Sequence, residues 1–241
     1  MRVAVYCITR DRLDYTKKSL KLLRKMAGCD VDLFVADNGS RHSTTSWLKA
    51  EKSAGNIKYL KLFSENKGQN IAANHLIDEI VKGEYRWVLR WDNDAIPRTR
   101  RFLKKLVRRS ERFLYSNVIC VTSPRITKLT HEPPPLGMGE ELGFKYHDVE
   151  ILGGICRLHP IALFHSWYKG EPAFRFSKFA PLGFGEASEM AGLCKRASIN
   201  MLRMVDLEVE HMGGEDSQKA DEPAEFSWER REVGRHVSYG L

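Results

Sequence analysis

The chain has 241 residues, a formal net charge of +8 and a pI of about 9.2. Its hydrophobic content of 42% and charged content of 29% are typical of a soluble globular protein. No apolar run approaches the roughly 20 residues that span a bilayer. The first apolar run of the chain is shorter than the apolar core of a signal peptide. We therefore expect a cytoplasmic protein without a transmembrane segment.

The first half of the chain alternates short apolar runs with amphipathic stretches. We expect strands at residues 3–8, 31–36, 57–63 and 87–91, and helices at residues 13–27, 43–53 and 69–81. Strands and helices that alternate in this way form a parallel sheet. Three polar loops, at residues 9–12, 37–40 and 92–94, should therefore converge on the edge where the strands end and where such sheets bind ligands.

The loop that follows the fourth strand contains two aspartates, Asp92 and Asp94, with Asn93 between them. Two carboxylates this close repel each other unless a divalent ion or a basic partner offsets their charge. Mg²⁺ or Mn²⁺ is the hard, oxygen-seeking ion that suits them, with water and nucleotide phosphates completing the coordination. A solvated turn or a helix cap is the alternative role for these three residues.

The second half gives weaker patterns. Pro97 is expected to start a helix over residues 98–109, in which seven of twelve residues are Lys or Arg; these form either a solvated face or a surface for a polyanion. We further expect a strand at 118–122, a mobile loop or hairpin at 128–147, a short helix at 159–168, an aromatic segment at 174–184, a helix at 186–197, a strand at 201–209 and a polar arm from residue 213. The five scattered cysteines suggest small buried thiols.

Four motifs in the first 110 residues resemble family 2 glycosyltransferases with the GT-A fold. They are Ile8-Thr9-Arg10 with Arg12, Val35 to Ser40, Glu65 to Gly68 continuing to Asn74, and Asp92-Asn-Asp94. The resemblance implies an α/β fold of the GT-A type, with a Rossmann-like mixed, mostly parallel sheet flanked by helices in a single domain. It also implies a glycosyltransferase domain over residues 1–212, with a nucleotide-sugar-binding half at 1–110, an acceptor-binding half at 111–212 and an arm at 213–241.

The same resemblance assigns roles to individual residues. It places Thr9, Arg12, Asp37, Asn38, Asn66, Lys67, Asp92 and Asn93 around the nucleotide sugar, and Asp92, Asp94 and His211 at the metal ion. Asp37 would accept a hydrogen bond from the base or ribose, and a cation would neutralise charge on the departing diphosphate. Each residue has an ordinary structural role as the alternative, such as turn formation for Asp37 and Asn38 or a surface charge for Arg12.

The general base is harder to assign. Family members carry an acidic Gly-Glu-Asp-x-Asp stretch at the start of a helix, whereas this chain has Gly185-Glu-Ala-Ser-Glu189, so Ala187 replaces the aspartate that usually removes the proton. Glu186 is the first candidate and Glu189 the second, and on a helix these two share a face. Glu186 can equally be an acidic residue favoured in the first turn of a helix.

Together these features predict a Mn²⁺- or Mg²⁺-dependent transfer of sugar from a nucleotide sugar, with a UDP-sugar as first expectation, to an acceptor hydroxyl with inversion. The +8 charge makes a polyanion such as modified DNA one acceptor to consider. A nucleotidyltransferase is the alternative enzyme, although it should have a Gly-rich loop after the first strand. A nucleic-acid-binding module would leave the aspartate pair unexplained. The oligomeric state stays open.

Overall fold

The computed structural model describes residues 1–128, 134–141, 143–165, 173–178 and 186–213. Its strands are β1 (Arg2–Thr9), β2 (Asp30–Asn38), β3 (Tyr59–Phe63), β4 (Trp87–Asp92), β5 (Ala95–Pro97), β6 (Cys120–Thr127), β7 (Gly137–Glu141), β8 (Phe144–Asp148), β9 (Cys156–Pro160) and β10 (Asn200–His211). Its helices are α1 (Leu13–Ala27), α2 (His42–Ser53), α3 (Gln69–Ile80), α4 (Phe102–Tyr115), α5 (Ala162–His165) and α6 (Glu186–Arg196). The strands form a single mixed sheet in the order β3-β2-β1-β4-β9-β6-β10-β8-β7, with β5 paired to β10.

Strand β1 lies between β2 and β4 and runs parallel to both. Its last residue, Thr9, is in register with Asp37 of β2, and Ile8 is in register with Asp92 of β4. The predicted parallel arrangement of the first four strands is therefore confirmed, and their carboxyl ends lie together. The loops that follow β1, β2 and β4 leave the sheet at this shared edge.

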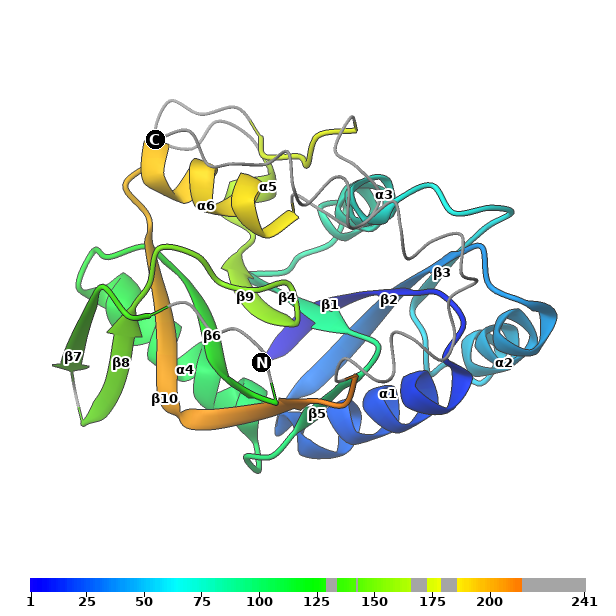
Figure 1. Ribbon diagram of the computed structural model, residues 1–241, viewed down its shortest axis with the longest axis horizontal. Helices are drawn as coiled ribbons and strands as arrows, with labels where there is room; N and C mark the ends of the chain where they lie inside the picture. The colour runs from blue at the N-terminus through cyan, green and yellow to red at the C-terminus, as the bar shows by residue number, and fades with distance from the viewer. Residues whose placement is uncertain (129–133, 142, 166–172, 179–185, 214–241) are drawn as a thin grey trace.

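Helices cover both faces of the sheet (Figure 1). Helices α1, α2 and α4 pack on one face and α3, α5 and α6 on the other. Val3, Val5 and Cys7 of β1 belong to the first core, whereas Ala4 and Tyr6 belong to the second. A strand buried on both sides has no polar face, which explains why its sequence is continuously apolar.

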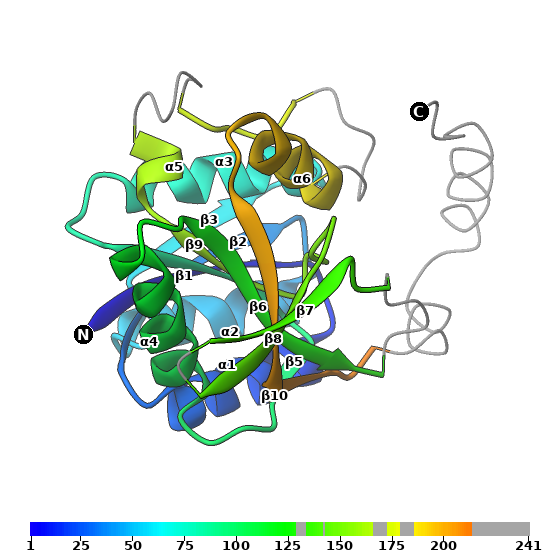
Figure 2. The same cartoon turned by 90° about the vertical axis from the view of Figure 1, so that its left-hand side faces the viewer.

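The second half of the sheet is built around β10, a twelve-residue strand that runs parallel to β6 and antiparallel to β8 and β5 (Figure 2). Strand β9 is antiparallel to β4 and joins the two halves of the sheet. The expected loop or hairpin at residues 128–147 contains the antiparallel pair β7 and β8. In the part of the chain that the structure describes, no helix has the length and apolar character to cross a membrane.

Two expectations for this half are wrong. Pro97 ends strand β5 and does not start a helix, because β5 pairs with β10 and the amides of Arg98 and Thr99 donate to the carbonyl of Glu208; α4 begins only at Phe102. The expected helix at 159–168 starts inside β9, and its described helical part is the short α5. Residues 166–168, most of the aromatic segment and the arm from residue 214 lie outside the described residues.

The cysteines match the expectation of buried thiols. All five are free, and Cys7, Cys120, Cys156 and Cys194 are buried while Cys29 is partly exposed. Burial raises the pKa of Cys29 to about 11 and that of Cys194 to about 12, which disfavours their reactive thiolate forms at neutral pH.

Candidate active site

Three loops meet at the carboxyl edge of the sheet, as the sequence predicts. The amide of Asp11 donates to Ser40 Oγ at 2.6 Å, which ties the loop after β1 to the loop after β2. Arg12, in the left-handed conformation with φ of 52°, donates to Asp94 Oδ2 at 3.0 Å and ties the first loop to the loop after β4. The acidic loop and the turn at residue 37 therefore share one neighbourhood, with Arg12 between them.

Asp37, at the end of β2, is fully buried. Its Oδ1 accepts a hydrogen bond from the amide of Ser40 at 2.9 Å, while its Oδ2 is buried with no partner among the described residues. Burial raises the pKa of Asp37, although the hydrogen bonds from Ser40 oppose the shift. A buried carboxylate oxygen without a partner is uncommon in folded proteins, and an N–H or O–H donor from a ligand would satisfy it.

Asn38 and Asn66 hold the loop before α3 against the end of β2. The Asn38 side chain donates to Asn66 Oδ1 at 2.7 Å and accepts from the amide of Lys67 at 2.8 Å. Asn66 Oδ1 also accepts from the amide of Gly68 at 3.0 Å. These two asparagines thus shape the loop, while the exposed Lys67 side chain pairs with Glu65.

Asp94 is 4% exposed and faces two basic side chains. Its Oδ2 lies 3.0 Å from Arg12 and 3.2 Å from His211 Nε2. Burial alone would raise the pKa of Asp94, but the hydrogen bond and charge of His211, together with Arg12, hold it below its usual value. The same contact outweighs desolvation at His211 and raises its pKa.

His211 reaches Asp94 because the end of β10 pairs with the loop after β4. His211 is in register with Ala95, and the amide of Met212 donates to the carbonyl of Asp94 at 2.8 Å. The structure therefore brings together two of the residues predicted to bind metal, although 117 positions of sequence separate them. Asp92 does not join them through a described contact, because its Oδ1 is bound by Arg90 at 2.5 Å.

A divalent cation fits this arrangement in part. Asp94 Oδ1 is buried and has no hydrogen-bond partner among the described residues, and an imidazole nitrogen lies beside the same carboxylate. Carboxylate oxygen and imidazole nitrogen are competent Mn²⁺ ligands. Within the described ranges, no group of three or more His, Cys, Asp or Glu side chains is positioned to hold a metal ion. Asp94 and His211 would thus leave most coordination positions to water and ligand oxygens, as Mg²⁺ and Mn²⁺ sites often do.

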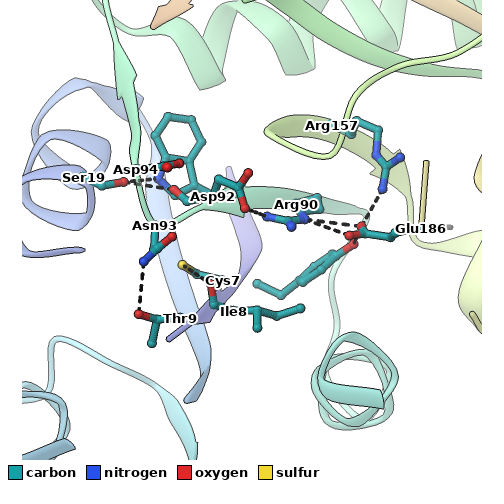
Figure 3. Close-up of polar contacts among 12 residues, drawn as sticks. Cys7, Ile8, Thr9, Ser19, Arg90, Asp92, Asn93, Asp94, Arg157 and Glu186 are labelled. Carbon is teal, nitrogen blue, oxygen red and sulfur yellow. Dashed lines mark hydrogen bonds and ion pairs between the residues drawn. The ribbon is translucent and has the colours of Figure 1, made fainter. Parts of the chain in front are cut away.

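The side chains of Asn93 and Thr9 bind other protein groups. The Asn93 side chain donates to Thr9 Oγ1 at 3.3 Å (Figure 3). It also donates to Thr16 Oγ1 at 3.1 Å. On the same helix face, Ser19 donates to the carbonyl of Asp92 at 3.1 Å. Helix α1 therefore fixes the backbone of the acidic loop, which leaves its carboxylates as the groups available to a ligand.

A chain of buried charges runs from Asp92 into the second half of the molecule (Figure 3). Arg90 donates to Asp92 at 2.5 Å and to both oxygens of Glu186 at 3.3 Å, and Arg157 donates to Glu186 at 2.5 Å. The Tyr6 hydroxyl also donates to Glu186, at 3.1 Å. Burial would raise the pKa of Glu186, but the two arginines and Tyr6 outweigh it and lower the pKa. A carboxylate that is 5% exposed and bound by two cations is a weak proton acceptor.

Glu189, the second candidate base, has different surroundings. It is partly exposed, and its oxygens accept hydrogen bonds from the Asn70 side chain at 3.0 Å and from the amide of Ser177 at 2.6 Å. Both donors are neutral. Among the described residues no cation contacts Glu189, whereas two arginines contact Glu186.

Sequence reasoning missed several residues that shape the site: Tyr6, Thr16, Ser19, Arg90 and Arg157. Thr16 and Ser19 could have been found, because they lie on the buried stripe of α1 with Leu20 and Leu23. Small polar residues on an otherwise apolar helix face indicate a polar neighbour. Arg90 and Arg157 gave no such indication, because their burial depends on a carboxylate from a distant helix.

The chain belongs to glycosyl transferase family 2, whose family model matches residues 4–168. Its fold is the GT-A fold, in agreement with the expectation from sequence. No curated protein sequence matches the chain.

Solved structures share this fold at low sequence identity. The 1–349 fragment of S. aureus TarS aligns over 88% of this chain and 60% of its own, with a TM-score of 0.61 and 15% identity. The mannosyltransferase PcManGT from Pyrobaculum calidifontis, solved with GDP-Man and Mn²⁺, aligns over 96% and 60%, with a TM-score of 0.60 and 13% identity. GalNAc-T7, solved with UDP, GalNAc and Mn²⁺, aligns over 90% and 45%, with a TM-score of 0.68 and 10% identity. The chain thus spans about 60% of the TarS fragment and of PcManGT, and 37% of the longer TarS chain.

Proposed function

We propose that this chain transfers a sugar from a nucleotide-sugar donor to an acceptor hydroxyl with the help of a divalent cation. One observation carries the proposal: two buried carboxylate oxygens, Asp37 Oδ2 and Asp94 Oδ1, have no protein partner among the described residues. They lie at one sheet edge, where the loops after β2 and β4 are both tied to the loop after β1. One oxygen suits an N–H or O–H group of a nucleoside, and the other suits a metal ion beside a diphosphate.

The roles of the residues follow from their contacts. Asp37 accepts a hydrogen bond from the base or ribose, while Asn38 and Asn66 keep the neighbouring loop in shape. Asp94 and His211 would hold the cation, which would supply positive charge beside the diphosphate. Arg12 adds a fixed positive charge at the same edge and favours an anionic ligand.

The acceptor hydroxyl needs a base, and we propose Glu189 for this role. Glu189 is partly exposed and contacts only neutral donors among the described residues, whereas Glu186 is buried and bound by two arginines, so the Glu189 carboxylate is the more open to an acceptor hydroxyl. The base takes the hydroxyl proton, the oxygen forms a bond to the anomeric carbon, and the bond to the diphosphate oxygen breaks. A single displacement of this kind inverts the anomeric configuration.

UDP and GDP sugars are the first donors to test. TarS has been solved with UDP-GlcNAc and PcManGT with GDP-Man and Mn²⁺, and both share the fold of this chain. Membership of family 2 favours sugar transfer over the two alternatives, nucleotidyl transfer and simple nucleic-acid binding. Neither the site nor the comparisons support DNA as the acceptor.

The test is a binding panel of UDP, GDP, CDP and TDP sugars with and without Mn²⁺, read as a shift in melting temperature, since a ligand selective for the folded state stabilises it. Asp94→Asn should remove the Mn²⁺-dependent part of the shift. Asp206→Asn is the matched control, because Asp206 is exposed and pairs with Arg109 away from these loops. A panel in which no nucleotide sugar shifts the wild-type protein would contradict the proposal.

A further inference from the structure

Arg90 occupies an unusual place for a charged side chain. It lies in the middle of the sheet on β4, two residues before Asp92, and its side chain is only 2% exposed. Its Nη1 binds Asp92 Oδ1 at 2.5 Å, and its Nε faces both oxygens of Glu186 at 3.3 Å (Figure 3). One guanidinium therefore bridges a carboxylate of the donor site and a carboxylate of α6.

The charges along this chain alternate in sign: Asp92, Arg90, Glu186 and Arg157. Burying them is costly, and well-packed apolar side chains of similar volume often stabilise a protein as well or better. What apolar side chains cannot supply is a fixed direction for each carboxylate. The planar guanidinium of Arg90 fixes that direction, because its Nη1 donates to Asp92 and its Nε to Glu186 at a rigid relative angle.

The far end of the chain is firmly anchored. Glu186 is the first residue of α6, and it is held by Arg157 of β9 and by Tyr6 of β1 as well as by Arg90. Arg157 is itself fully buried and donates to the carbonyl of Leu152. Because Arg90 binds Glu186 at one side and Asp92 at the other, the position of Glu186 restricts that of the Asp92 carboxylate. The Asp92 side chain is 24% exposed at the end of β4.

We propose that Arg90 is a positioning residue for donor binding: it fixes the Asp92 carboxylate at the sheet edge and couples it to the first turn of α6. On this proposal Asp92 binds Arg90 and the donor, while Asp94 and His211 face the cation. The inference rests on the proposed function, because it assigns Arg90 to the nucleotide-diphosphate site.

The experiment is a double-mutant cycle on nucleotide affinity, measured by calorimetry with UDP and GDP in the presence of Mn²⁺. The variants are Arg90→Met, Asp92→Asn and the double variant, with Arg90→Gln as a second substitution if Arg90→Met does not fold. Arg109→Met is the matched control, since Arg109 also binds a carboxylate, that of Asp206, but on α4. Melting temperatures are recorded for every variant.

We expect Arg90→Met to weaken affinity at least tenfold and Arg109→Met to leave it unchanged. Because Arg90 acts through Asp92, the double variant should bind no more weakly than Asp92→Asn alone. Arg90→Lys keeps the charge but loses the planar set of donors that reaches both carboxylates. Its affinity should therefore lie between that of the wild type and that of Arg90→Met.

If the wild-type protein binds nucleotide, two results would overturn the inference alone. The first is an affinity of Arg90→Met equal to that of Arg109→Met. The second is a double variant whose fold-loss in affinity equals the product of the losses of Arg90→Met and Asp92→Asn. A wild-type protein that binds neither nucleotide would overturn the proposed function and this inference together. The two kinds of failure are thus separated by the wild-type measurement.

Discussion

Gly39, between Asp37 and Ser40, shows how a single residue sets the shape of the site. It has φ of 83°, and a Cβ added there would lie 2.6 Å from the carbonyl carbon of Glu65. Gly55 has a similar φ of 76° but has no atom within 4 Å of an added Cβ. Alanine at Gly55 would therefore introduce backbone strain alone, whereas alanine at Gly39 would introduce backbone strain and steric overlap.

We predict that Gly55→Ala costs about 1–2 kcal/mol of unfolding free energy, from the left-handed backbone alone. Gly39→Ala should cost about 1–3 kcal/mol more, because the loop before α3 must move away from the new methyl group. It should also weaken nucleotide binding, whereas Gly55→Ala should not. Urea unfolding and a binding titration measure both effects, and equal stability losses would contradict the steric argument.

Asp32 provides a test of pH dependence away from the site. It accepts hydrogen bonds from Lys58 Nζ at 2.7 Å and the Tyr85 hydroxyl at 2.6 Å. Burial would raise the pKa of Asp32, but these contacts hold it below the usual 3.8. A carboxyl group with a lowered folded-state pKa stabilises the protein above its unfolded pKa, and this contribution disappears as the pH falls through the folded pKa.

We therefore expect Asp32→Asn to destabilise the protein at pH 7 and to match the wild type once the pH falls well below 3.8. Lys58 is half exposed, so solvent screening limits the loss to about 1 kcal/mol or less. Melting curves between pH 3 and 7 measure the difference.

At the scale of elements, the first turn of α6 carries both candidate bases, Glu186 and Glu189, in different environments. Glu186→Gln leaves Arg157 and Arg90 without a charged partner on that side and should cost about 3–5 kcal/mol of stability. Glu189→Gln keeps one acceptor oxygen but turns an NH₂ group toward one of its two donors, Asn70 and Ser177, so it should cost about 1–3 kcal/mol. It should nevertheless abolish transfer while donor binding persists. An active Glu189→Gln enzyme would contradict our choice of base.

The elements also show what a sequence can and cannot predict. Strands β1, β2 and β4 each contain a short run that is mostly apolar, so their type, order and parallel pairing follow from pattern alone. Strand β9 contains Arg157 and His159, both fully buried, and polar residues in a short run do not suggest a central strand. Their burial depends on Glu186 and on the carbonyls of Leu152 and Val88, contacts that only the folded chain creates.

The site divides in the same way. Asp37, Asp94 and the convergence of their loops were predictable, because they depend on strand ends in a parallel sheet. The contact of His211 with Asp94 was expected only through resemblance to a family, since it depends on β10 pairing with β5. The ion pairs of Arg90 with Asp92 and Glu186 were not predictable, because a single arginine inside a mostly apolar strand gives no sequence pattern that indicates its partners.

At the scale of the whole molecule, the amide of Met212 connects the last described strand to the acidic loop. We predict that Mn²⁺ with UDP or GDP slows hydrogen exchange at Met212 as well as at Ser40 and Lys67, whose amides bond to Asp37 and Asn38. The amide of Leu136, which bonds to Asp148 in the β7–β8 region, is the internal control and should be unaffected. Protection confined to Ser40 and Lys67 would show that β10 does not take part in the site.

The pairing of β10 with β5 also sets an order of events during synthesis. A ribosome has released both aspartates of the acidic loop long before it reaches His211, so an emerging chain carries Asp94 without its histidine. We therefore predict that affinity for a nucleotide sugar arises only after β10 has been made. In refolding, the appearance of that affinity should mark the docking of β10 and not the earlier assembly of the parallel strands.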